Sequence, residues 1–402
     1  MRLIDAVTWS CAAAPVAMVY GAKWRSVPRW FGGIFNSTCA AAFVRRKTPP
    51  PLVPEPRDEK RDEPLADCAE IVASEAFEAG GDANSLVEEM LARGRFALLL
   101  RPQLIANLSP EQLARARTAL SEGMCLVPAG EVIVHRTTGT SEQDSDTPGR
   151  AESPVWVDGY YVDRYQVTNA EYFQFVRHGG YEQMGIWDPE VLPAVLDFVD
   201  ATGHPGPRNW RDGRYPRGED HHPVVGVCWY EAAAYARWVG KRLPTDAEWT
   251  KSASWPVAIA GQPLLQRRYP WGEAVDRTRA NLWGSGPGRT VPVEEFASGV
   301  SVGGVQQLIG NVWEWTADSL RLQPDDELPD TPTRKMKSLR GGAYDTYLDC
   351  QATCHFQSGD DVLARKHNIG FRCAISLCDF AQFNSDDEIP TQESDSFVEA
   401  EV

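Results

Sequence analysis

The chain has 402 residues, enough for one large domain or two smaller ones, and its 56 acidic and 40 basic residues give a net charge of −16. This charge argues against nucleic acid as a partner, because phosphate binding needs a basic face. No run of 18 apolar residues occurs, so the sequence predicts no membrane span. The nine cysteines form no Cys-x-x-Cys pair, which argues against structural zinc.

Residues 1–66 are basic at first and then proline-rich, so we expect a disordered leader and linker. Residues 12–22 are mildly apolar, which either a secretory signal or a start codon placed too far upstream would explain. We expect a cytoplasmic protein, with a secreted or periplasmic location as the alternative if the N-terminus is a signal.

Residues 67–122 are predicted to form a helical segment. Leu86, Met90 and Leu91 have helical spacing, and Ser109 followed by Pro110 is typical of the start of a second helix. We therefore expect a small helical pair within residues 84–121. Its role would be packing or dimerisation.

Residues 123–378 are predicted to form the main domain. Two T-x-x-E capping boxes, Thr168 with Glu171 and Thr245 with Glu248, each predict a short helix. A third helix should end at Gly240, because glycine favours the left-handed conformation after a helix. The expected helices span residues 169–177, 231–239 and 246–253.

Two further segments are polar. Residues 136–152 are rich in Thr, Ser, Asp and Gly and predict an exposed loop. Residues 379–402 are acidic and poor in order-promoting residues, which predicts a disordered tail.

The segment 309–318 contains a Gly-Asn turn followed by Trp313, Glu314 and Trp315. Tryptophan normally needs burial, so the carboxylate between the two rings should be half buried and should require a cation or hydrogen-bond donors. A core turn with an ion-paired Glu314 would meet this need. A calcium ion bound by Glu314 and nearby backbone carbonyls would also meet it.

Eight further stretches accompany this segment, and in this order they resemble the formylglycine-generating enzyme (sulfatase-modifying factor) family. The resemblance covers roughly residues 123–378 and is specific because the stretches recur in family order. They are residues 124–131, 163–172, 222–229, 241–249, 269–273, 279–283, 339–344 and 368–373. The resemblance implies an α+β fold, the C-type-lectin-like formylglycine-generating-enzyme fold, with little regular structure.

The family's enzymes oxidise a cysteine of a client sulfatase to formylglycine with O₂, using copper held by two cysteines after an Arg-Gly-Gly turn. Soft thiolates suit Cu(I). In this chain, counting forward from Arg340 places the first cysteine position at Thr346. Counting back from Cys373 places the pair at Tyr344 and Asp349. Neither register supplies the two thiols.

Cys350 and Cys354 are the candidates for a rearranged catalytic pair, and copper is expected only if they form one. Their spacing of four converges on a metal only in a helix, which this context does not favour, so free buried thiols are the alternative. The resemblance places the disulfide partners of Cys354 and Cys373 near Ala236 and Ala253. Their loss indicates reduced thiols and a reducing compartment.

The resemblance also implies calcium sites. The first would use Gln307, Gly310, Val312 and Glu314, with Gln307 in place of the family's Asn but retaining an oxygen donor. A second, weaker site would involve Asn281 and Leu282, and its later Asp ligand has no clear match. No His-x₃-His-x-Glu triad is present, so the iron chemistry of the wider family is unsupported.

Retained framework motifs beside a missing cysteine pair lead to the first hypothesis: a divergent member that binds a protein or peptide through Trp313, Tyr344 and His355. An active oxidase that uses Cys350 and Cys354 is the rival. A regulatory partner of a kinase or other enzyme is a third hypothesis, which rests on family analogy alone. The sequence names neither the partner nor the oligomeric state.

Overall fold

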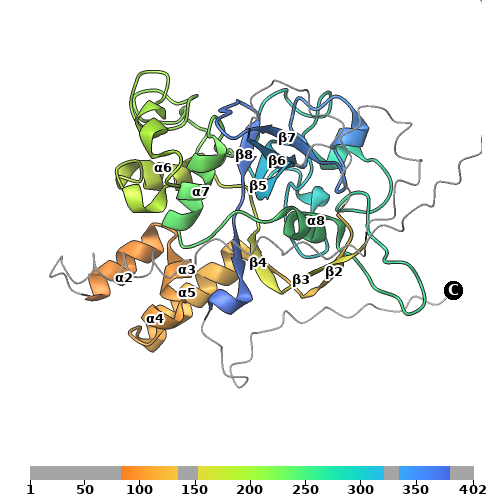
Figure 1. Ribbon diagram of the computed structural model, residues 1–402, viewed down its shortest axis with the longest axis horizontal. Coiled ribbons are helices and arrows are strands. Elements are labelled where there is room, and N and C mark those ends of the chain that lie inside the picture. The colour runs from red at the N-terminus through yellow and green to blue at the C-terminus, as the bar shows by residue number, and fades with distance from the viewer. Residues whose placement is uncertain (1–82, 135–152, 321–334, 381–402) are drawn as a thin grey trace, which may run out of the picture. The chain divides into compact units, whose positions relative to one another are not determined.

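The computed structural model describes residues 83–134, 153–320 and 335–380 (Figure 1). The chain divides into two units, and all of these residues belong to the second, Lys60–Val402. The predicted leader, the predicted loop at 136–152 and residues 381–402 lie outside the described residues. Within the described part of the chain, no helix is long and apolar enough to cross a membrane.

The predicted helical pair consists of two longer helices joined by two single-turn helices. Gly94, at φ 72°, follows the first helix, and Pro102 begins the third. As predicted, Ser109 caps the last helix, and its side chain accepts a hydrogen bond from the backbone N–H of Gln112. The four helices are α2 (Ala83–Ala92), α3 (Phe96–Leu99), α4 (Pro102–Ile105) and α5 (Pro110–Gly123).

This helical segment packs on the main domain. Arg95 and Arg101 donate hydrogen bonds to the carbonyls of Trp238 (2.9 Å) and Gly240 (3.0 Å), at the C-terminal end of a main-domain helix. Gly240 has a φ of 79°, and a Cβ there would lie 2.6 Å from the side chain of Leu98. The helical core also takes in Ile375 and Phe380 from the C-terminal part of the fold. Of the two predicted roles, the structure shows packing.

In the part of the chain that the structure describes, the β structure consists of three small sheets. One is antiparallel, in the order β1 (Met124–Val127), β4 (Tyr160–Asp163) and β9 (Ala374–Ser376). The second pairs β2 (Gly130–Val132) with β3 (Val155–Val157). The third has the order β7 (Ser358–Asp361), β6 (Met336–Arg340), β5 (Trp313–Ser319) and β8 (Ile369–Phe371), and its β5–β8 pair is parallel.

The three predicted helices of the main domain are confirmed, with shifts of one or two residues at their ends. Both predicted capping boxes form, at Thr168 and at Thr245. The helices are α6 (Asn169–Arg177), α7 (Trp229–Trp238) and α8 (Asp246–Ser254). The short 3-10 helices are η2 (Met184–Ile186), η3 (Leu192–Asp197), η4 (Arg277–Arg279), η5 (Ala297–Gly299), η7 (Asp349–Gln351) and η8 (Leu377–Asp379).

An aromatic core surrounds α6 and α7, which lie together beside the four-stranded sheet (Figure 1). Tyr172 of α6 stacks on Tyr235 of α7 with ring centroids 5.3 Å apart, and Phe371 of β8 meets both rings edge-on. Trp315 of β5 belongs to the same cluster. Tyr235 and Trp238 of α7 are buried in this core. The fold is α+β with much irregular structure.

Candidate functional site

The Trp-Glu-Trp segment forms the start of β5, so its successive side chains point to opposite faces of the sheet. Trp315 is fully buried, and its indole N–H donates to the carbonyl of Val227 (3.2 Å). Trp313, on the same face, is half buried, and its ring centroid lies 6.1 Å from that of Phe356. Glu314 points to the other face and is 1% exposed.

Four hydrogen bonds satisfy the Glu314 carboxylate. The guanidinium of Arg372 donates through Nε to Oε2 and through Nη2 to Oε1, both at 2.7 Å. Trp249 of α8 donates its indole N–H to Oε2 (2.7 Å), and Gln166 donates its amide N–H to Oε1 (2.9 Å). Each donor comes from a different one of the motifs described above. In this structure Glu314 is therefore ion-paired, as the first of the two alternatives predicted.

A second buried ion pair lies at the start of α8. Asp246 accepts hydrogen bonds on Oδ1 from Arg340 (3.1 Å), Ser338 (2.7 Å) and Thr316 (2.8 Å). Burial alone would raise the pKa of Asp246, but the Arg340 charge and these hydrogen bonds hold that pKa below 3.8. The predicted capping-box helix is thus tied by its first residue to β5 and β6.

The Gly-Asn turn and the Arg-Gly-Gly turn pack against each other. The backbone N–H of Gly310 donates to the carbonyl of Gly341 (2.9 Å). Gly310 has a φ of 85°, and a Cβ there would lie 2.5 Å from the carbonyl oxygen of Asn281, so only glycine fits. Asn311 is fully buried, and its amide joins Gln166, Asn281 and the backbone of Val291. This packing fixes the segment after Arg-Gly-Gly relative to β5.

The residues of the first predicted calcium site do not present a calcium-type donor set in this arrangement. Both oxygens of Glu314 already accept from Arg372 and from a second donor, so the carboxylate is neutralised without a metal. The Gln307 amide nitrogen lies 2.7–3.1 Å from three backbone carbonyls, and its buried Oε1 has no hydrogen-bond partner. The carbonyl of Gly310 accepts from the N–H of Val312. Calcium binding here stays a prediction.

The second predicted calcium site has one suitable donor. Asn281 is buried, and its Oδ1 has no hydrogen-bond partner. The carbonyl of Leu282 already accepts hydrogen bonds from Ser285 and Gly286. Within residues 83–134, 153–320 and 335–380, no three His, Cys, Asp or Glu side chains gather as a metal site would require. This site also stays a prediction.

The three positions that the copper cysteines would occupy have other roles in the structure. Thr346 is buried, and its hydroxyl accepts the backbone N–H of Ala343 (2.8 Å), which closes the turn after Arg-Gly-Gly. Asp349 pairs with Arg277 (2.6 Å). Tyr344 is half buried, with its ring 6.1 Å from that of His367. None of these side chains can supply a thiolate.

The two candidate cysteines lie in different environments. Cys350 is half buried in η7, whereas Cys354 is fully buried, and burial raises the pKa of its thiol well above 9. A thiol in this state is a poor source of thiolate. Cys373 is also buried and free, and every cysteine within the described residues is free. His355 is half buried and accepts a hydrogen bond from Arg340 through its carbonyl.

The structure adds polar residues to the predicted binding surface. Asn368 links two parts of it, because its carbonyl accepts from the N–H of Trp313 (2.9 Å) and its amide donates to the Asp345 carboxylate (3.1 Å). His367 lies 3.7 Å from the same carboxylate. Sequence reasoning missed these residues, although Asn368 begins one of the quoted motifs and Asp345 follows another directly.

A model of the sulfatase-modifying factor enzyme 1-like domain matches residues 110–377. The chain belongs to this family. The match begins inside the helical segment, so α5 is part of the family domain. The matched range includes Gln166, Trp249 and Arg372, which donate to Glu314, and Arg340, which pairs with Asp246.

Two related proteins and one solved structure show how this family member compares with others. Formylglycine-generating enzyme from Mus musculus is 30% identical over 352 residues, which cover 76% of this chain and 91% of that protein. Hercynine oxygenase from Mycolicibacterium smegmatis is 33% identical over 222 residues, 53% of this chain and 49% of that protein. The structure of PvdO from Pseudomonas aeruginosa is 22% identical with a TM-score of 0.42, and the match covers 63% of this chain and 94% of that one.

Proposed function

We propose that this member of the sulfatase-modifying factor family binds a protein or peptide and lacks the copper–cysteine oxidase centre. The observation that carries the proposal is the segment after Arg340. Its candidate copper positions hold a buried threonine, a tyrosine and an ion-paired aspartate, while Cys354 lies fully buried. Copper held between two thiolates needs two accessible sulfurs that converge, and these positions do not provide them.

The surface that we assign to binding combines aromatic and polar groups. Trp313 and Tyr344 are half buried, so each ring has one face fixed by the fold and part of its surface open to solvent. Such rings supply large contact area at little cost in conformational entropy. The Asp345 carboxylate, oriented by Asn368, adds a directed hydrogen-bond acceptor beside them.

The neighbouring loops hold two more exposed aromatic side chains. Tyr347 is 68% exposed and Trp283 is 54% exposed. Arg277 bonds the carbonyls of both residues as well as the Asp349 carboxylate, so one guanidinium joins the two loops. A preorganised surface of this kind favours binding because few groups must become ordered when the partner arrives.

The rival hypothesis is an oxidase in which Cys350 and Cys354 form a rearranged copper pair. It predicts tight one-to-one binding of Cu(I) by the reduced, metal-free protein, measured against a competing chelator. We expect no such binding. Tight binding that disappears in both Cys350→Ser and Cys354→Ser, together with O₂ uptake in the presence of a cysteine-containing peptide, would overturn the proposal. Cys378→Ser serves as the control, because Cys378 is exposed and lies in another part of the fold.

The binding function needs its own test. A display selection of random peptides against the whole chain should enrich a common motif. Binding of the enriched peptide should weaken in a Trp313→Ala, Tyr344→Ala double variant. A matched Val155→Ala, Trp156→Ala variant carries the same kind of change in exposed residues of β3 and should bind normally. Enrichment of no motif, or equal loss in both variants, would contradict the proposed surface.

A further inference from the structure

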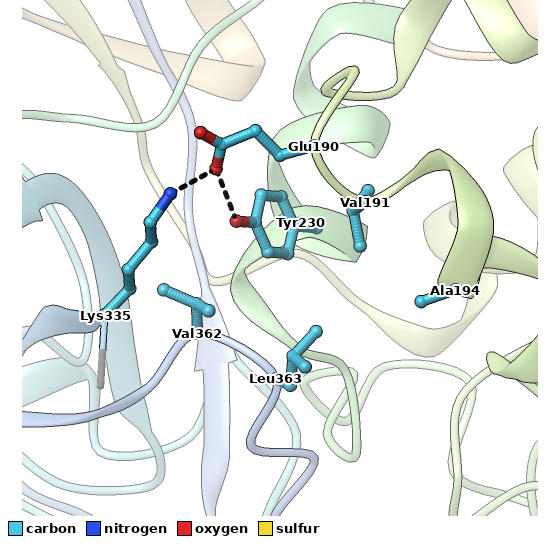
Figure 2. A pocket seen from close by; sticks show the side chains of 7 residues that line it. All are labelled: Glu190, Val191, Ala194, Tyr230, Lys335, Val362 and Leu363. Carbon is cyan, nitrogen blue, oxygen red and sulfur yellow. Dashed lines mark hydrogen bonds and ion pairs between the residues drawn. The ribbon is translucent and has the colours of Figure 1, made fainter. Parts of the chain in front are cut away.

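A pocket of about 310 Å³ lies beside α7, and none of its lining residues belongs to the proposed binding surface (Figure 2). It is lined by one residue of α7, the loop that leads into η3, one residue of η3 itself, the residue before β6 and the two residues after β7. Its lining residues are Glu190, Val191, Ala194, Tyr230, Lys335, Val362 and Leu363. The volume is at the lower end of the range of small-molecule sites, which suits a ligand the size of one amino acid.

One wall of the pocket carries two opposite charges side by side. Lys335 Nζ lies 2.6 Å from Glu190 Oε2, and the hydroxyl of Tyr230 donates to the same oxygen at 3.4 Å. Figure 2 shows both interactions on one carboxylate oxygen, so the other oxygen, Oε1, is available as an acceptor. The ammonium of Lys335 uses one of its three N–H donors on Glu190.

The rest of the lining is aliphatic. Val191 and Val362 are buried, Ala194 is half buried, and Leu363 is 49% exposed at the rim. The pocket therefore offers a cation, an anion and an apolar surface within the reach of one small molecule. Tyr230 adds a permanent donor, because burial, followed by the nearby charges of Glu190 and Asp188, raises its pKa to about 12.

We propose that this pocket binds a free α-amino acid with an aliphatic side chain, of which leucine is the model. The α-carboxylate would pair with Lys335, the α-ammonium with Glu190, and the side chain would cover Val191, Val362 and Leu363. Both partners of the Glu190–Lys335 pair are more than half exposed, at 59% and 65%. An exposed ion pair contributes little to stability, so the ligand's charges can replace it at little cost.

The proposal predicts that three features of the ligand are needed together. Isothermal titration of the whole chain with L-leucine should show one-to-one binding. Leucinamide lacks the carboxylate, 4-methylpentanoate lacks the ammonium, and glycine lacks the side chain. Each should bind about tenfold more weakly or worse, since each loses a charge-assisted contact or the apolar contact.

Variants of the protein test the same contacts by changing the pocket instead of the ligand. Glu190→Gln and Lys335→Met should each weaken leucine binding by about tenfold or more. Glu88→Gln removes a charge from another ion pair of similar exposure, Arg115–Glu88, and should leave binding unchanged. Thermal melting of each variant checks the fold, and because both sites are exposed we expect melting temperatures close to that of the original chain.

Two outcomes would overturn the proposal. One is equal binding of leucine, leucinamide and 4-methylpentanoate, which would show that Glu190 and Lys335 do not bind the ligand's charged groups. The other is the absence of leucine binding at concentrations up to about 10 mM, far above a useful affinity. The proposal shares no residue with the peptide surface, so either result leaves the proposed function to its own test.

Discussion

The Glu314 network and the segment that follows Arg-Gly-Gly are joined through β5 and β6, yet they satisfy their polar groups in different ways. Glu314 and Arg372 are both buried, and the structure pairs every oxygen of the carboxylate. Arg277 and Asp349, in the other region, are paired at 39% and 40% exposure and have water as an alternative partner. Loss of a partner from a buried charge therefore costs much stability, whereas loss of a partner from an exposed charge costs little.

This difference supports the proposal that the family framework is kept here while the copper ligands are not. A residue of the network can change only together with its partners, and those partners come from several distant motifs. An exposed residue of the segment after Arg-Gly-Gly, such as Asp349, can change alone, provided that the turn after Arg340 still closes. Thr346 closes that turn here through its hydroxyl.

The largest expected effect is on the Glu314–Arg372 pair. Arg372→Met removes the cation and leaves a buried carboxylate without charge compensation, so unfolding in urea should show a loss of about 3–5 kcal/mol. Arg277→Met is the matched control and should cost less than about 1 kcal/mol, because its pair is exposed. Similar losses in both variants would show that the two regions do not differ as described.

Replacing the two tryptophans of β5 should also give stability losses of different size, because one is buried and the other is half buried. Trp315 is fully buried, so Trp315→Ala should cost about 3–5 kcal/mol through lost burial and a residual cavity. Trp313 is half buried, and Trp313→Ala should cost roughly half as much or less. Chemical denaturation of both variants measures the difference. A larger loss for Trp313 would place it in the core and remove it from the binding surface.

The Asp246 network should give the fold part of its sensitivity to acid. The folded-state pKa of Asp246 lies below 3.8, so its stabilising contribution is present above about pH 4 and is lost as the pH falls through that lower value. Asp246→Asn should lower stability at neutral pH by about 1–3 kcal/mol and flatten the acid side of the stability curve. Asp197→Asn, at an exposed site, should change neither. An unchanged acid slope in Asp246→Asn would contradict this role.

The smallest expected difference is between the effects of Glu314→Gln in calcium and in chelator. Because donors from protein side chains already hold both oxygens of Glu314, Glu314→Gln should lower the melting temperature equally in calcium and in chelator. Differential scanning fluorimetry of the original chain and the variant measures this directly. A loss that appears only in calcium would establish Glu314 as a calcium ligand and require Arg372 to move away.

Local sequence signals predicted the local structure well. The capping boxes at Thr168 and Thr245 act over three residues, and the helices that they start appear where expected. The prediction of a helical pair was incomplete. The connection between the two helices contains two further short helices, separated by Gly94 and Pro102 from what precedes them. The motifs also identified the fold, and the matches to relatives support it.

The sequence by itself determined that Glu314 needed a counter-charge, hydrogen-bond donors or a metal, and it predicted a half-buried side chain where the structure has one that is 1% exposed. It could not choose between them, because the choice depends on groups that lie 58 to 148 positions away along the chain. Tertiary structure brought Gln166, Trp249 and Arg372 to the carboxylate. The same long-range packing, which no local pattern encodes, placed Glu190, Tyr230 and Lys335 around one pocket.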